Sequence, residues 1–168
     1  ALGFGGTLDP PVSALAESYN GSSWTEVGDL NEARYGIAGA GASNTAALAF
    51  GGYTGTARSV NTETWNGSGW TEVANLNTGR NALAGAGASN TAALAFGGAS
   101  STGKTETWNG SGWTELNDMN TARYSLAGAG TYTSALVFGG FASPRTVNTE
   151  TWNGTSWTEV NNLNAARD

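Results

Sequence analysis

The chain has 168 residues, of which 12% are charged, and its formal net charge at pH 7 is −6. The acidic balance argues against binding to nucleic acid, because a phosphate backbone is bound by a basic patch. Histidine and cysteine are both absent, so the usual ligands of zinc, copper and iron are missing and we expect no metal and no cofactor. The sequence contains no run of 18 apolar residues, which is about the length that a membrane-spanning helix needs.

One unit of about 44 residues recurs four times and fixes the organisation of the chain. Its clearest marker is Thr-Glu-Thr-Trp-Asn-Gly-Ser-Gly-Trp-Thr-Glu-Val at 62–73, with close equivalents at 105–116 and 149–160 and a looser one at 16–27. The second tryptophans of the markers are spaced by 46, 43 and 44 residues: Trp24, Trp70, Trp113 and Trp157. The units are therefore 1–34, 35–80, 81–123 and 124–168.

Each unit predicts short β-strands and no helix. A short apolar run closed by two glycines, as at 47–52 and 93–98, is typical of a strand buried on both faces. Thr-Glu-Thr-Trp follows a loop of variable length, and its alternation places Glu63 and Trp65 on one face. An Asn-Gly step then predicts a hairpin with a tight two-residue turn, and Trp-Thr-Glu-Val forms the next strand.

A further strand is predicted after each arginine that lies ten residues beyond a second tryptophan. These arginines are Arg34, Arg80, Arg123 and Arg167. The strands predicted after the first three, at 35–42, 81–88 and 124–130, alternate alanine and glycine. Glycine weakens an exposed strand, so this composition favours an inner position where backbones lie close together.

Units with paired glycines, spaced aromatics and four strands fit a β-propeller and resemble the kelch repeat. The resemblance rests on Gly51-Gly52, on Trp65 and Trp70, and on the Leu-Asn-x-x-Arg segment at 76–80, and it covers nearly the whole chain. The two tryptophans are closer together than is usual in kelch repeats. Thr-Glu-Thr-Trp-Asn-Gly-Ser-x-Trp is also similar to kelch-like repeat proteins of marine phages. The implied fold is all-β, a propeller of four four-stranded blades.

The strand order of kelch blades gives fifteen strands here, because the first unit lacks its inner strand. The chain ends at Asp168, where a further inner strand would begin. Since propellers close by completing one blade from both termini, we expect the four units to belong to a larger ring or oligomeric assembly. A self-closed ring of four blades is the alternative.

The loops at 7–13, 53–61, 99–104 and 141–148 differ between units and are expected to share one face with the arginine crossovers. Divergent loops on a rigid scaffold are a common layout for a binding surface. Our candidate contact residues there are Tyr53, Arg58, Lys104, Phe141 and Arg145. The alternative is that the charges only keep the loops soluble.

Acidic residues recur in two rows: Glu17, Glu63, Glu106 and Glu150, and Glu26, Glu72, Glu115 and Glu159. An active site is normally unique, so these residues and the repeated arginines are expected to be structural. We expect the arginines to bind carbonyls or a glutamate where blades meet.

The kelch resemblance also implies enzymes such as galactose oxidase, whose copper site needs two histidines and a cysteine-linked tyrosine that this chain lacks. We therefore predict a noncatalytic structural or protein-interaction module of an extracellular or virion assembly. Its partner would be another protein or further copies of itself. A carbohydrate-binding propeller that uses Tyr53 and Phe141 is the alternative, and an enzyme with one asymmetric cluster of ionisable groups is a third hypothesis.

Overall fold

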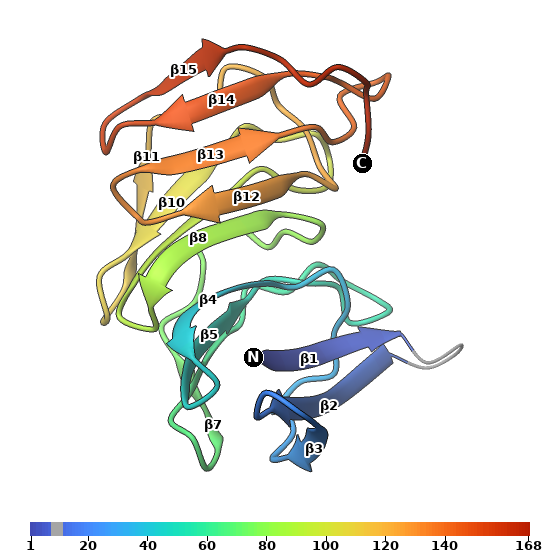
Figure 1. Cartoon of the computed structure of the whole chain (residues 1–168), viewed down its shortest axis with the longest axis vertical. Helices are drawn as coiled ribbons and strands as arrows, with labels where there is room; N and C mark the ends of the chain where they lie inside the picture. Colours follow the sequence, from blue (N-terminus) through green and yellow to red (C-terminus); the bar gives the residue numbers. More distant parts are fainter. Residues whose placement is uncertain (8–11) are drawn as a thin grey trace.

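The structure, a computed structural model, describes residues 1–7 and 12–168, so residues 8–11 of the first variable loop lie outside the described part (Figure 1). The strands form four antiparallel sheets, here called blades. The first blade contains β1 (Leu2–Thr7), β2 (Val12–Tyr19) and β3 (Trp24–Val27). The second contains β4 (Ala38–Ser43), β5 (Ala46–Phe50), β6 (Thr62–Trp65) and β7 (Trp70–Val73). The third contains β8 (Ala84–Ser89), β9 (Ala92–Phe96), β10 (Thr105–Trp108) and β11 (Trp113–Leu116). The fourth contains β12 (Ala127–Gly130), β13 (Ala135–Phe138), β14 (Thr149–Trp152) and β15 (Trp157–Val160).

The blades follow one another in chain order and stack into an arc, with the first and fourth blades apart (Figure 1). Strands β4, β8 and β12 are the inner strands, and β8 packs between β4 and β12. The fifteen strands and the three-stranded first blade agree with the prediction from the repeat. The described residues contain no helix, and so none long and apolar enough to cross a bilayer.

The hairpin between the two outer strands has a longer loop than the sequence predicted. Trp65 lies directly opposite Trp70, so the loop is the four residues 66–69, and the expected two-residue turn was wrong. The side-chain oxygen of Asn66 accepts hydrogen bonds from the amides of Ser68 (2.9 Å) and Gly69 (3.0 Å). An asparagine side chain that binds backbone two and three residues ahead replaces part of the ladder and lengthens the turn.

The inner strands begin three residues later than predicted, at Ala38, Ala84 and Ala127. Their glycines are required by close packing. A Cβ atom on Gly85 would lie 2.7 Å from the carbonyl oxygen of Gly39 and 2.7 Å from the ring of Phe50. Such contacts leave no room for a side chain, which explains the alternation of alanine and glycine.

The core consists of three hydrophobic clusters, each between two adjacent blades. In each cluster a phenylalanine of one blade meets the second tryptophan of the next blade edge to face. Phe50 and Trp113 have ring centroids 4.9 Å apart, and Phe96 and Trp157 have centroids 5.0 Å apart. Among the described residues, no such cluster joins the fourth blade to the first. Stability therefore arises from neighbouring blades, as in other repeat proteins.

Candidate functional site

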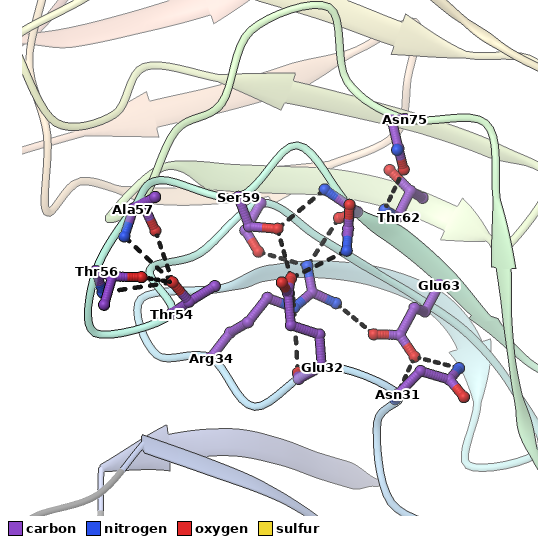
Figure 2. Close-up of polar contacts among 12 residues, drawn as sticks. Asn31, Glu32, Arg34, Thr54, Thr56, Ala57, Ser59, Thr62, Glu63 and Asn75 are labelled. Carbon is purple, nitrogen blue, oxygen red and sulfur yellow. Dashed lines mark hydrogen bonds and ion pairs between the residues drawn. The ribbon is translucent and has the colours of Figure 1, made fainter.

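Each contact between adjacent blades, here called a junction, contains a buried arginine. At the first junction, Nη1 of Arg34 donates to the carbonyl oxygens of Gly51 (2.6 Å) and Asn61 (2.7 Å), and Nη2 donates to Oε1 of Glu63 at 2.7 Å (Figure 2). The Arg34 side chain is fully buried and that of Glu63 is 1% exposed. A buried guanidinium therefore holds three acceptors of the second blade in place.

The second oxygen of the Glu63 carboxylate is occupied from the same crossover. Both the backbone amide and the side-chain amide of Asn31 donate to Oε2 of Glu63 at 2.7 Å (Figure 2). Glu32, two residues before Arg34, accepts hydrogen bonds from Ser59 and Asn61 of the next blade. Each carboxylate oxygen of Glu63 thus has a partner, which a buried charge requires.

The second junction repeats this arrangement. Arg80 donates to the carbonyl oxygens of Gly97 (2.9 Å) and Lys104 (2.8 Å) and to the carboxylate of Glu106 (2.7 Å). Both amides of Asn77 donate to Glu106 at 2.8 Å. Burial lowers the pKa of Arg80 below its ordinary value, and the Glu106 carboxylate acts in the opposite direction.

At the third junction, Nη1 of Arg123 lies 3.0 Å from the Glu150 carboxylate, without the alignment of a hydrogen bond. Burial lowers the pKa of Arg123, again against the effect of Glu150. The predicted structural role is confirmed for the arginine and the glutamate of each of the three junctions, whereas Arg167 and Glu17, the remaining members of the two rows, are exposed. The other row, represented by Glu72, is exposed on the outer strands.

The five candidate contact residues stand in three loops, one in each of the last three blades. Tyr53 forms a β-bridge with Arg58 in the second blade, and Phe141 forms one with Arg145 in the fourth. Lys104, in the third blade, lies 2.7 Å from Glu115. The structure therefore brings together the two pairs but does not gather the five residues into one site.

Each of these basic side chains also has a polar partner close by. Nε of Arg58 donates to the side-chain oxygen of Asn81 at 3.3 Å, and Arg145 pairs with Asp168. The ring of Tyr53 packs edge to face on Tyr35 and that of Phe141 packs at a tilt on Tyr124, with centroids 5.5 and 5.3 Å apart. These contacts occupy part of the surface that a ligand would use.

One cavity lies instead between the first and second blades, and two others lie on the blades at the ends of the stack. A groove of about 500 Å³ between β1 and β4 is lined by residues that include Leu2, Phe4, Gly39, Ala40 and Gly41. A cavity of about 270 Å³ on the first blade is lined in part by Gly5, Leu15 and Glu17. Another of about 270 Å³ on the fourth blade is lined in part by Leu126, Phe138 and Arg167. None of the five loop candidates lines these cavities.

Equivalent residues differ in exposure at these ends. Trp24 of the first blade is 52% exposed, whereas Trp70 of the second is 8% exposed. Leu136 of the fourth blade is 39% exposed, whereas Leu94 of the third is fully buried. The sequence analysis did not predict these end faces. The signal for them was that the first and fourth units also carry the residues that form contacts between blades. The end faces are the candidate functional site.

Comparison with solved structures places the chain beside YjhT, a protein of β-propeller-type fold. The two structures match with a TM-score of 0.73 and 14% sequence identity, over 89% of this chain and 53% of YjhT. The chain thus spans about half the length of the YjhT structure. No protein-family model matches the sequence, and no curated protein sequence matches it. The chain has the fold of a β-propeller with four blades, an architecture suited to a binding or protein-interaction module.

Proposed function

We propose that the chain is a noncatalytic, kelch-like structural module that binds protein partners at the open inner edge of its first blade and at the ends of its blade stack. The observation that carries this proposal is the groove of about 500 Å³ beside β1. Within the described part of the chain, β1 pairs only with β2, whereas its equivalent β5 pairs with both β4 and β6. One edge of β1 therefore offers backbone donors and acceptors to an added strand.

The groove suits an extended segment of small residues. Its lining includes Gly39, Ala40, Gly41 and Ala47, which leave space close to the backbone. In the second blade the corresponding place is filled by β4, whose sequence is Ala-Gly-Ala-Gly-Ala-Ser. A partner strand of similar composition would complete the first blade by main-chain hydrogen bonds.

The ionisable groups support a noncatalytic role. The charged side chains that are buried in the described residues all belong to the arginine–glutamate pairs of the three junctions. Catalytic groups usually form one asymmetric set in a cleft, and these pairs repeat instead. The similarity of the repeat to phage proteins makes a virion or extracellular assembly the proposed setting.

Hydrogen exchange tests strand addition at this edge. A synthetic peptide with the sequence of residues 35–44 should slow exchange of the β1 amides, Leu2–Thr7, because it supplies the inner strand. The control is the same peptide with proline at the position of Ala40, which removes a donor from the ladder. Equal exchange of β1 with and without the first peptide would overturn the proposal.

A carbohydrate-binding role is the second candidate. Its support is the two aromatic contacts, Tyr35 with Tyr53 and Tyr124 with Phe141, at equivalent places in the second and fourth blades. Aromatic faces are common platforms for sugars and other ring-shaped ligands. Binding on a glycan array that Tyr53→Ala or Phe141→Ala abolishes would favour this role, and a silent array would count against it.

A further inference from the structure

We propose that the fourth blade of one molecule binds the first blade of a second copy, head to tail, and rebuilds a junction between them. The inference rests on the proposed interaction function and names its partner. It follows from unmatched halves of the repeated contact, which lie on opposite ends of the same chain. The first-blade face contains Gly5, Leu15, Glu17 and Trp24, and the fourth-blade face contains Leu136, Phe138, Thr149 and Arg167.

Arg167 is held in the same way as the buried arginines. The carbonyl oxygen of Arg167 accepts a hydrogen bond from Gly140 of its own blade at 2.7 Å, as that of Arg34 does from Gly6 at 2.8 Å. Nε of Arg167 lies 3.4 Å from the carbonyl oxygen of Ala165, a distance that Arg34 repeats with its own neighbour two residues before it. The side chain is therefore positioned for a junction, yet it is exposed.

The first-blade face contains the matching acceptor site. Glu17 is exposed, and it lines the cavity of about 270 Å³ together with Gly5 and Leu15. These are the repeat equivalents of the three residues that bind Arg34: Gly51, Asn61 and Glu63. A guanidinium entering this cavity would meet one carboxylate and two backbone carbonyls, as it does at the other junctions.

A second, neutral contact is also divided between the ends. At the second and third junctions a tryptophan ring nitrogen donates to a threonine of the preceding blade, as Trp157 does to Thr105 at 2.9 Å. The hydroxyl of Thr149 is buried and has no hydrogen-bond partner among the described residues. Trp24, which is the equivalent donor, is exposed on the first blade. Joining the two faces would satisfy the buried hydroxyl.

The apolar part of the junction is divided in the same way. Phe96 packs on Trp157 of the next blade, and Leu94 beside it is fully buried. Their equivalents Phe138 and Leu136 face the end of the stack, where Leu136 is 39% exposed. Docking against Trp24 of a second copy would remove this apolar surface from water. Charge, hydrogen bonding and apolar packing thus point to one partner.

Charge reversal followed by mixing tests the interface. Sedimentation or light scattering should give the wild-type chain a mass above its 17.0 kDa monomer. Arg167→Glu alone and Glu17→Arg alone should each weaken association at least about tenfold, because like charges then meet. Mixing the two variants should restore association, because each junction between unlike copies again joins opposite charges. Glu72→Arg, an exposed change outside the end faces, is the matched control and should leave the mass unchanged.

Trp24→Ala provides a test that does not depend on exchanging charges. The Trp24 side chain is 52% exposed, so the variant should fold, and its association should weaken. A wild-type monomer at all concentrations would overturn the proposal, and so would normal association of Trp24→Ala. If the first and fourth blades of one molecule bound each other, mixing the two charge variants would not restore association. Restored association therefore excludes a chain closed on itself. Protection of β1 by the strand peptide remains measurable on a monomer, so failure here and failure of strand binding are distinguishable.

Discussion

Nη2 of Arg80 donates a hydrogen bond of 2.7 Å to Glu106 across the junction between the second and third blades, and each side chain is 1% exposed. The pair joins two blades through charges that have no access to water. Removing one member of such a pair leaves the other charge buried and uncompensated, which is costly, whereas the intact pair adds little to stability by itself.

Glu106→Gln should lower the free energy of unfolding by about 3 to 5 kcal/mol, because the Arg80 guanidinium would lose its counter-charge in the interior. Urea denaturation followed by tryptophan fluorescence measures this change. The matched control, Glu72→Gln, alters an exposed glutamate of the neighbouring blade and should change stability by less than about 0.5 kcal/mol. Equal losses in the two variants would show that the pair does not stabilise the junction.

Ala16→Thr should raise the free energy of unfolding by about 1 kcal/mol, a typical contribution of one hydrogen bond. The ring nitrogen of Trp70 is buried without a partner in the described part of the chain, whereas Trp113 and Trp157 donate to threonines. Ala16 occupies the equivalent threonine position. Ala16→Val adds similar volume without a hydroxyl and should give no such gain in thermal unfolding. A gain equal to that of threonine would assign the effect to packing.

Gly85→Ala should lower stability by about 1 to 3 kcal/mol, because the new methyl group would overlap the Gly39 carbonyl and the Phe50 ring. Gly69→Ala is the control. A Cβ atom there meets nothing within 4 Å, and the loop position requires no left-handed backbone. Thermal melts of both variants compare the two sites. A stable Gly85→Ala protein would mean that the inner strands can separate at little cost.

The surface hydrogen bond between Lys104 and Glu115 should shift the pKa of the Glu115 carboxyl group. The hydrogen bond from Lys104, 2.7 Å long, lowers the pKa of Glu115 below its ordinary 4.5. A lowered pKa in the folded state stabilises the fold above the unfolded value, and this effect disappears as the pH falls through the lowered pKa. Lys104→Met should therefore return the Glu115 pKa toward 4.5 in an NMR titration. An unchanged Glu115 would disprove the contact in solution.

The repeat allowed the sheets and their strand order to be predicted, because the same aromatic and glycine positions return in every unit. Turn length could not be predicted, since it depends on the Asn66 side chain binding backbone ahead of it. The inner strand starts at Ala38 and not at Tyr35, because Tyr35 forms a bridge with Tyr53 in the crossover.

The end faces were harder to predict for a different reason. Trp24 and Trp70 are the same amino acid in equivalent strands, and they differ in exposure only because Trp70 has a preceding blade to pack on. Exposure of this kind is a property of neighbours in space, which a local pattern does not report. Loop residues such as Tyr53 and Lys104 were predicted to bind a ligand because the loops differ between units. In the structure Tyr53 packs on Tyr35 and Lys104 pairs with Glu115.

Each arginine is fixed by its main chain to one blade and gives its side chain to the following one, and this makes the number of units adjustable. Deleting residues 81–123 would place Arg80 directly before Tyr124, where its side chain would reach Glu150 in place of Arg123. Such a shortened chain, or one lengthened by a further unit, would use the same contacts between adjacent blades. Duplication or loss of whole units in the gene would change the size of the assembly while preserving every type of contact within it.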